Sequence, residues 1–534
     1  MLRQLASRIG DEGWAVLQLG RAGLLKPMSP LQLPSLVRAV VSYGELGAAV
    51  TLAAVRYRDA VALIDERGSL TFGDLDARSN ALANEWRRAG LTPGDTIAIL
   101  ARNHRGLIDA LFASTKTGAR VVLLNTDFGS NQIHDVVVRE NAELLVYDDE
   151  YAEAASGLDL RHGRVRAWAE QPGEDTLDAL IERGDPSSPP AARARAKIII
   201  LTSGTTGTPK GAPRSVPLSL LPLAGLLDKI PFRTGEVTEC CTPLFHSLGF
   251  GHAMLALLMG STLVVRRRFD PRLTLESIAA HRASVITVVP IMLSRILDLG
   301  PEARADLDLS SLRIIFVAGS QLGAALCTRA MDAFGPVIYN LYGSTEVAYA
   351  TVATPTDLKA EPGCVGRVVR GAVVKIFDDD GHEVPAGATG RIFVGNSAQF
   401  EGYTGGGTKE IIGGLMSSGD VGHFEDGRLF VDGRDDEMIV SGGENVFPGE
   451  VEETLTAHPD LLDAAVVGVH DDDYGQRLRS FVVLRPGASL TEQDVKDYVR
   501  GRLARYKVPR DVVFVDELPR NPTGKVVKRL LDAK

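Results

Sequence analysis

The chain has 534 residues, a net charge of −10, and a composition of 45% hydrophobic and 24% charged residues. This length exceeds what one ordinary core supports, so we expect at least two domains, and the composition is that of a folded globular protein rather than a disordered one. The acidic balance disfavours a non-specific nucleic-acid binder, which needs a basic surface, so a nucleotide site would have to be a local positive pocket.

Residues 1–57 form a leader before the first clear strand. Its second half, residues 36–57, is apolar-rich and predicts a helix, but Arg38, Tyr43 and Glu45 interrupt the apolar run, so a transmembrane helix is rejected. Two interpretations stay open: the leader packs on the main domain, which we favour, or it lies on a membrane surface. The membrane alternative depends on its basic residues, which are Arg3, Arg8, Arg21 and Lys26.

The cysteines indicate a reducing environment. Cys240, Cys241, Cys327 and Cys364 show no metal-ligand CxxC spacing, and no secretory segment opens the chain. We therefore expect a cytoplasmic protein. If the leader contacts a membrane, the protein would be peripheral at its inner face.

From Ala60 onward, short apolar runs alternate with amphipathic segments. A helix is predicted to begin at Thr71, with Asp74 placed for a near capping box. This alternation predicts an α/β sheet covered by helices. The runs predicted as strands are 60–64, 96–100, 121–124, 144–147, 198–201, 284–290 and 313–317.

The tail of the chain predicts a small α+β unit. Its strands are expected at 464–469, 480–484 and 511–515, and its helix at 491–503. The predicted fold class is therefore α/β: a large N-terminal domain of several subdomains over residues 58–434, joined by a hinge to a small C-terminal α+β domain over residues 435–534.

The strand at 198–201 runs into a loop of hydroxyl residues and glycines that ends in a lysine. Glycines let a backbone approach an anion, and successive N–H groups form an anion-binding concavity. The loop predicts a polyphosphate site, with a flexible surface loop as the plain alternative. Pro209 and Gly211, on either side of the lysine, exclude a Walker P-loop. The candidate binding residues are Thr202, Ser203, Gly204, Thr205, Thr206, Gly207 and Lys210.

Residues 242–251, TPLFHSLGFG, place His246 beside Phe245, after a proline and before glycines. A lone histidine beside an aromatic residue is more often structural than catalytic, but the glycines indicate a close approach of the backbone to a ligand. The strand at 313–317 is followed by Gly319 and Ser320, where small residues let a flat ligand lie against the backbone.

Residues 342–346 read YGSTE. Tyr342 offers a π-face for a base, Thr345 a donor for a phosphate, and Glu346 a hard oxygen ligand for Mg²⁺. Five residues alone could form any turn, but these follow the phosphate loop in the chain. Asp420, in a loop expected at 417–422, is placed to accept two ribose hydroxyls or to form an Asx turn.

In this order, the segments resemble the adenylate-forming superfamily, which comprises acyl-CoA synthetases, peptide-synthetase adenylation domains and luciferases. The resemblance extends over roughly residues 50–530 and includes the segments GRDDEMIVSGGENVFP and PTGK. It implies that Tyr342 stacks on adenine, Arg434 reaches the ribose, and Glu346 holds Mg²⁺. Gly319, Ser320 and Gly343 are placed with them at the nucleotide.

The resemblance also implies the moving parts and the acyl pocket. Lys525 becomes the adenylation lysine and Asp436 the hinge, with Ser441, Gly442 and Gly443 bordering a channel for the pantetheine of CoA. The acyl pocket would be lined by Phe245, His246, Val288, Gly319 and Gly343. Amino-acid-activating relatives usually carry an aspartate where His246 stands, so an α-amino acid substrate is disfavoured. The implied catalytic residues are Lys525, Glu346, Thr345 and His246.

The implied activity has two steps: ATP and a carboxylic acid form an acyl-AMP, and CoA then takes the acyl group. ATP, Mg²⁺ and CoA are the expected cofactors and co-substrates, with no nucleic-acid partner. Since the pocket residues are apolar or small and include no carboxylate, we expect a medium- or long-chain fatty acid, and the chain looks most like bacterial fatty-acyl-CoA synthetases. Two alternatives stay open: a fatty-acyl-AMP ligase that serves a carrier protein, and a non-catalytic relative that binds nucleotide or acyl ligands.

Overall fold

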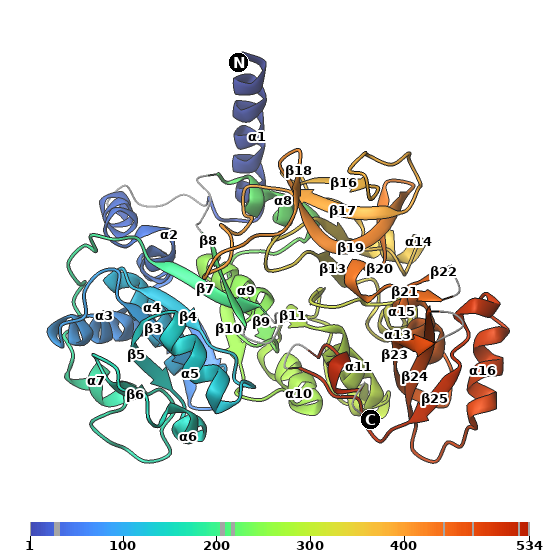
Figure 1. The fold of residues 1–534 in the computed structure, drawn as a ribbon. Helices are drawn as coiled ribbons and strands as arrows, with labels where there is room; N and C mark the ends of the chain where they lie inside the picture. The colour runs from blue at the N-terminus through green and yellow to red at the C-terminus, as the bar shows by residue number, and fades with distance from the viewer. Residues whose placement is uncertain are drawn as a thin grey trace.

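The computed structural model of the protein describes residues 2–25, 32–202, 209–214, 219–441, 444–471, 475–521 and 524–531. Within these ranges, none of the helices combines the length and the apolar character that crossing a membrane requires. The chain folds into a large N-terminal part and a small C-terminal part, which carries the red end of the ribbon in Figure 1.

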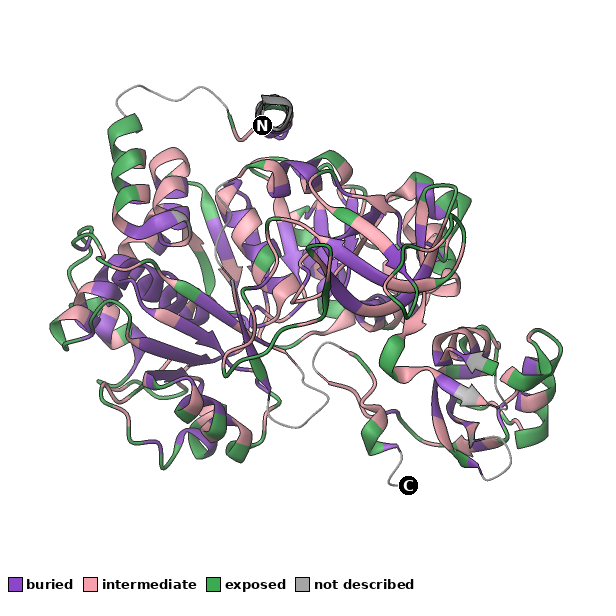
Figure 2. Ribbon diagram, turned by 45° about the horizontal axis from the view of Figure 1, so that its top comes forward, coloured by how far each residue is buried: buried purple, intermediate pink, exposed green. Residues whose placement is uncertain are grey.

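The first sheet of the large domain has the strand order β6-β5-β3-β4-β7-β8 and is parallel except for β8. Its central strands are continuous apolar runs because helices cover both faces, and Figure 2 shows them mainly buried. The strands are β3 (Thr96–Leu100), β4 (Arg120–Leu123), β5 (Ala142–Tyr147), β6 (Arg164–Arg166), β7 (Lys197–Thr202) and β8 (Lys210–Arg214).

The second sheet has the order β15-β14-β13-β12-β11-β9-β10-β1-β2, and its strands from β13 to β1 run parallel. These strands are β1 (Val61–Asp65), β2 (Gly68–Thr71), β9 (Val237–Cys240), β10 (Thr262–Val265), β11 (Val285–Val288), β12 (Ile314–Val317), β13 (Ile338–Tyr342), β14 (Thr351–Ala353) and β15 (Arg367–Val368). The apolar runs predicted β1, β3, β4, β5, β7, β11 and β12, whereas β6, β9, β10 and β13 of the two sheets were not predicted.

Helices between the strands fill the space around the two sheets, and one hydrophobic core joins Leu63 of the second sheet to Ile99 of the first. The predicted helix after Thr71 is α3, whose N-terminus has a full capping box between Thr71 and Asp74. The helices of this part are α3 (Phe72–Arg88), α4 (Arg105–Thr117), α5 (Ser130–Arg139), α6 (Ala152–Ala155), α7 (Leu177–Arg183), α8 (Leu221–Lys229), α9 (Ser247–Leu258), α10 (Pro271–His281), α11 (Pro290–Asp298), α12 (Glu302–Ala305), α13 (Ala324–Phe334) and α14 (Pro355–Ala360).

The leader forms two helices, α1 (Leu2–Arg21) and α2 (Leu33–Tyr57), which pack on the large domain. The α2 helix kinks at Gly44, where φ is +72°. It is tied to α3 and α4 through Asp76, which accepts bonds from Thr51 at 2.5 Å and from the buried Lys116 at 2.7 Å. Packing is therefore the interpretation that the described leader residues support, although Figure 1 shows α1 standing out from the body of the molecule.

An antiparallel sheet completes the large domain and was not predicted. Its order is β16-β17-β19-β18, and β20 pairs with the later part of β19 along the same edge as β18. The strands are β16 (Val373–Phe377), β17 (Gly390–Gly395), β18 (Ile411–Ile412), β19 (Leu415–Glu425) and β20 (Arg428–Arg434). The prediction of a loop at 417–422 is wrong, because these residues lie inside β19. The misleading glycine is Gly419, which has φ +81° within the strand.

The small domain begins after the 3₁₀ turn at Asp435–Glu437. Its sheet has the order β22-β21-β24-β23, and β25 pairs with β24 in parallel. The elements are β21 (Ile439–Ser441), β22 (Glu444–Val446), α15 (Pro448–Thr456), β23 (Leu461–Asp471), β24 (Gly475–Leu484), α16 (Glu492–Arg500) and β25 (Asp511–Phe514). The predicted helix at 491–503 is shorter than expected, and it buries Val495 and Val499.

Candidate active site

Five of the predicted site segments lie at the carboxyl ends of strands in the two parallel sheets. The carboxyl ends of parallel strands meet at the same edge, which is where open α/β sheets bind ligands. The phosphate loop follows β7, the histidine segment follows β9, and the segments at 288, 319–320 and 342–346 stand at the ends of β11, β12 and β13, whereas Asp420 and Arg434 lie on the antiparallel strands β19 and β20. The topology therefore brings together segments that are far apart in the sequence.

The centre of the phosphate loop, residues 203–208, lies outside the described residues, so Ser203, Gly204, Thr205, Thr206 and Gly207 are not placed. The two ends of the loop are placed. Thr202 and Lys210 face each other across the β7–β8 pair, and the Thr202 hydroxyl donates to the carbonyl of Lys210 at 3.2 Å. The Lys210 ammonium lies 5.1 Å from the centre of the Tyr403 ring.

Tyr403 connects this lysine to Glu346. Its hydroxyl donates to Oε1 of Glu346 at 2.8 Å, and the hydroxyl of Ser344 donates to Oε2 at 3.0 Å. Next to Glu346, the Thr345 hydroxyl lies 3.0 Å from the hydroxyl of Ser247, the first residue of α9. Lys210, Glu346 and Thr345 thus share one neighbourhood, joined by contacts with Tyr403 and Ser247.

A second chain of contacts starts at Tyr342. Its hydroxyl donates to Asp420 at 2.6 Å, and Arg434 pairs with Asp420 and with Asp436, each at 3.2 Å. Asp420 and Arg434 are direct partners in the register of β19 and β20, which explains their approach. Burial raises the pKa of the Asp420 carboxyl, against the opposing effects of Tyr342 and Arg434.

The predicted acyl side is apolar and closely packed. Phe245 and the ring of His246 are 4.6 Å apart, and burial lowers the pKa of His246 to about 4, so its imidazole is neutral at pH 7. Val288 and Val289 both belong to the hydrophobic core, and Val289 also approaches Gly319: a Cβ added at Gly319 would lie 3.2 Å from a methyl group of Val289.

Glycine is required at position 343, because a Cβ there would lie 2.1 Å from the carbonyl oxygen of Ala348. Gly319 has φ +97°, a conformation that side chains other than glycine rarely adopt, and Ser320 beside it is exposed. These backbone features leave open surface around the end of β12, where a flat ligand was expected.

The small domain reaches the same edge through its C-terminal loop. A Cβ added at Gly524 would lie 2.0 Å from Cγ2 of Ile291 in α11, so this loop touches the large domain directly. Figure 1 shows the red C-terminal segment beside α11. Lys525 follows at once; its ammonium is half exposed and lies 3.5 Å from Glu437, which also pairs with Lys528 at 2.9 Å.

The expected CoA-channel residues are only partly placed. Ser441 ends β21, where it pairs with Glu444 and Gly475 inside the small domain. Gly442 and Gly443 lie outside the described residues. Ser441 therefore belongs to the small domain, so its position relative to the large domain depends on how the two domains are arranged.

Among the described residues, no three His, Cys, Asp or Glu side chains gather as an all-protein metal site would need. A magnesium ion that accompanies a nucleotide needs only one or two carboxylates, since phosphates and water complete its shell. Glu346 fits that requirement, because Tyr403 and Ser344 orient both of its oxygens.

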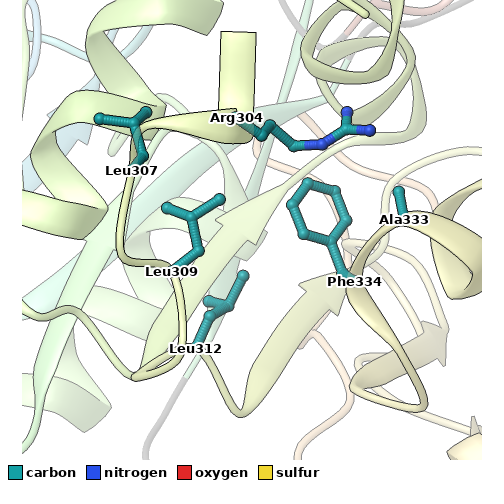
Figure 3. Close-up of a pocket in the computed structure, with 6 residues that line it drawn as sticks. All are labelled: Arg304, Leu307, Leu309, Leu312, Ala333 and Phe334. Carbon is teal, nitrogen blue, oxygen red and sulfur yellow. The ribbon is translucent and has the colours of Figure 1, made fainter. Parts of the chain in front are cut away.

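A separate cavity of about 270 Å³ lies away from this edge. It is formed near the amino ends of β12 and β13, where leucine side chains face the Phe334 ring below Arg304 (Figure 3). The site segments follow the carboxyl ends of the strands, so this cavity is not part of the candidate site. Its lining residues are Arg304, Leu307, Leu309, Leu312, Ala333 and Phe334.

Sequence reasoning missed several residues that the structure brings to the site. Tyr403, Ser247 and Val289 each contact a predicted site residue, and Ile291 contacts Gly524, which precedes the predicted Lys525. Tyr403 had one usable signal, since an aromatic residue stands at the start of a glycine-rich stretch, GYTGGGT. The other three are apolar or hydroxyl residues at element ends, and only the fold reveals their contacts.

Comparison with known proteins gives consistent results over most of the chain. Residues 50–404 match the AMP-binding enzyme family, and residues 450–525 match the AMP-binding enzyme C-terminal domain. A feruloyl-CoA synthase from an Amycolatopsis species is 33% identical over 467 residues, which cover 86% of this chain and 93% of that protein. A fatty acid–[acyl-carrier-protein] ligase from Streptomyces coeruleorubidus is 30% identical over 493 residues, covering 88% and 92%.

A solved structure leads to the same family. The o-succinylbenzoate CoA synthetase of Bacillus subtilis, in complex with its acyl-adenylate intermediate, superposes with a TM-score of 0.79 at 25% identity, over 90% of this chain and 97% of that one. The predicted fold class is confirmed, and so is the resemblance at the level of the superfamily. The chain belongs to the AMP-binding enzyme family, with the adenylate-forming fold of a large N-terminal α/β domain followed by a small C-terminal domain.

Proposed function

We propose that the protein is an AMP-forming acid–CoA ligase, which activates a carboxylic acid with ATP to an acyl-AMP and then transfers the acyl group to CoA. The observation that carries this proposal is the environment of residues 342–346. Within five residues, Tyr342 contacts Asp420 of β19, Thr345 contacts Ser247 of α9, and Glu346 contacts Tyr403. Tyr342 offers a ring face to a base, Thr345 a hydroxyl to a phosphate, and Glu346 a carboxylate to a metal ion.

The first step requires two anions to meet, because a carboxylate oxygen attacks the α-phosphorus of ATP. The protein must therefore position the reactants and offset their repulsion. Lys210, Arg434 and Lys525 provide positive charge, and Glu346 would hold Mg²⁺, which supplies further positive charge at the phosphates. No enzyme nucleophile is needed, because the carboxylate of the acid itself attacks the phosphorus.

The acid is proposed to be apolar beyond its carboxylate. Phe245, Val289 and Gly319 offer no charge to pair a polar or cationic substrate. An aromatic acid is the leading candidate, because the relatives with 33% identity and the solved structure are named for feruloyl and o-succinylbenzoate thioesters. A medium- or long-chain fatty acid, as expected from the sequence, is the second candidate, favoured by the relative from Streptomyces coeruleorubidus.

The test is a panel of acids with acid-dependent pyrophosphate release as the readout. It runs from hydroxycinnamic and arylacetic acids to fatty acids of increasing chain length, with and without CoA. We expect AMP and an acyl-CoA in equal amounts, with an aromatic acid preferred. Formation of ADP instead of AMP would contradict the proposal, and so would a failure of every acid to release pyrophosphate.

The same panel separates the proposal from a carrier-protein ligase. If acyl-AMP accumulates at a rate that CoA does not change, and CoA acquires no acyl group, the acceptor is not CoA. The fatty-acyl-AMP ligase alternative would then replace our choice. Nucleotide binding without any turnover would favour the non-catalytic alternative.

We also keep the membrane contact of the leader as a proposal. It is supported by apolar side chains exposed on α1, Val16 at 44% and Leu17 at 64%, on the same helix as exposed Arg21. Pelleting with anionic vesicles tests it: full-length protein should pellet and a variant lacking residues 1–31 should not, and equal partitioning would reject the contact.

A further inference from the structure

The boundary between the two domains contains a hydrogen bond that joins two helices. Glu453 lies on α15 of the small domain, and its Oε1 accepts the backbone N–H of Ala324, the first residue of α13, at 2.7 Å. A Cβ added at Gly323 would lie 3.7 Å from the same oxygen. The carboxylate of one domain therefore sits at the amino end of a helix in the other.

Helix α13 has no cap of its own. The first N–H groups of any helix lack partners within the helix, and a side-chain oxygen or a negative charge usually satisfies them. Here the N-cap residue is Gly323, which makes no side-chain cap, and the first turn of this eleven-residue helix contains no acidic residue. Glu453 supplies the missing group from across the domain boundary.

The cap shares a loop with the candidate nucleotide site. Gly319 and Ser320 begin the short loop, residues 319–323, that leads to the start of α13. A Cβ added at Gly449, near the start of α15, would lie 3.1 Å from the side-chain oxygen of Gln321. The small domain thus rests directly on the loop that carries two predicted nucleotide residues, while Gly524 rests on Ile291.

We propose that Glu453 is a positioning residue that holds the small domain in the adenylate-forming arrangement by capping α13 across the domain boundary. The inference rests on the proposed function, in which the small domain rotates between the two steps. Because the bond joins the two domains, that rotation breaks it. Glu453 consequently stabilises the arrangement that brings Lys525 to the large domain and contributes nothing to the one that follows.

The test compares the two half-reactions in Glu453→Ala. Acyl-AMP formation, measured as pyrophosphate release, should fall about two- to thirty-fold, the range that loss of a helix cap corresponds to. Thioester formation from supplied acyl-AMP should be unchanged or faster. Glu453→Gln should recover part of the first rate, because its amide oxygen accepts the same N–H bond without the charge.

Glu450→Ala is the matched control. Glu450 lies on the same helix but pairs with Lys507 inside the small domain, so its loss should leave the ratio of the two half-reactions unchanged. If both half-reactions slowed equally in Glu453→Ala, Glu453 would have only a structural role. If neither rate changed, the cap would have no role in the mechanism.

A second readout does not depend on turnover. Hydrogen exchange at the amide of Ala324 should be faster in Glu453→Ala than in wild type or Glu450→Ala, since the cap protects that amide. Equal exchange would overturn the proposal even if the rates changed. If wild type activates no acid while Ala324 is protected by Glu453, the proposed function fails and the docking contact remains.

Discussion

The candidate site has two halves, and different contacts hold them in place. The nucleotide half surrounds residues 342–346, and the lysine half contains Lys525. Around residues 342–346, partners come from strands, helices and loops of the large domain, such as Asp420 on β19 and Tyr403. Lys525 stands on a loop of the small domain, which meets the large domain through Gly524 on Ile291 and Glu453 on α13.

This difference separates a fixed half from a movable one. The contacts of Tyr342, Asp420 and Glu346 would survive a rotation of the small domain, whereas those of Gly524 and Glu453 would not. Arg434 lies at the boundary, because it pairs with Asp420 on one side and Asp436 on the other. Substitutions in the movable half should therefore separate the two reaction steps, and those in the fixed half should reveal the nucleotide and metal chemistry.

The largest effect is expected for Lys525→Ala. Acyl-AMP formation should fall by a factor of at least about 10², the typical result of removing a charge-stabilising donor from an active site. Thioester formation from supplied acyl-AMP should remain, because the proposal assigns the lysine to the first step only. Pyrophosphate release and acyl-CoA formation measure the two steps separately.

Lys496→Ala provides the control for this change, since Lys496 pairs with Glu492 on α16, within the small domain. It should leave both steps close to wild type. If Lys525→Ala slowed both half-reactions equally, the assignment of Lys525 to adenylate formation would be wrong, and the division into fixed and movable halves would lose its strongest member.

The next effect is expected at the hinge. Asp436→Pro fixes φ near −65° at the position where the domains are expected to turn, so the thioester step should slow by roughly ten-fold or more while acyl-AMP formation changes less. Asp436→Ala removes the same carboxylate from Arg434 without restricting the backbone. Similar rates in the two variants would place the turning point elsewhere.

A smaller effect is expected in the fixed half, at Tyr403→Phe. This change removes the hydroxyl that orients Glu346 but keeps the ring beside Lys210. Loss of such an outer partner typically costs about ten-fold or more in metal affinity, so the Mg²⁺ concentration for half-maximal pyrophosphate release should rise about ten-fold. If the Mg²⁺ requirement did not change, Tyr403 would have no role in binding Mg²⁺.

The sequence predicted the parts of the fold that depend on local patterns. The parallel strands that are continuous apolar runs, such as β3, and the capping box at Thr71 and Asp74 are short-range signals, so both were found, whereas polar strands such as β6 and β9 were missed. The antiparallel sheet was missed because its strands are interrupted by glycines, and Gly419 within β19 was interpreted as part of a loop.

For the candidate site, residue types in order along the chain selected Glu346, and the family resemblance selected Arg434 and Lys525; all three assignments stay predictions. Their partners were not predictable in the same way. Tyr403 reaches Glu346 across 57 positions, and Glu453 reaches Ala324 across 129 positions. Such contacts depend on how sheets and domains pack, which no local pattern encodes.

The smallest effect concerns the stability of the fixed half and involves His246. Burial lowers its pKa from 6.5 to about 4, so the folded state disfavours the charged imidazole. His246 leaves the free energy of unfolding at its full value above pH 6.5. Between pH 6.5 and about 4 it lowers that free energy progressively, because the unfolded state takes up the proton more readily than the folded state. Between pH 7 and pH 5 the loss is at most about 2 kcal/mol, from about 1.4 kcal/mol per pKa unit.

His246→Phe should remove this part of the acid sensitivity, because phenylalanine fills the place beside Phe245 and carries no proton. The buried His252, whose pKa is also lowered to about 4, keeps its own contribution in both proteins, so the decline of the melting temperature from pH 7 to pH 5 should become shallower rather than vanish. Thermal unfolding at both pH values measures it. Parallel declines in the two proteins would mean that His246 is already charged in the folded state, and the apolar wall of the acyl side would then be more hydrated than its packing indicates.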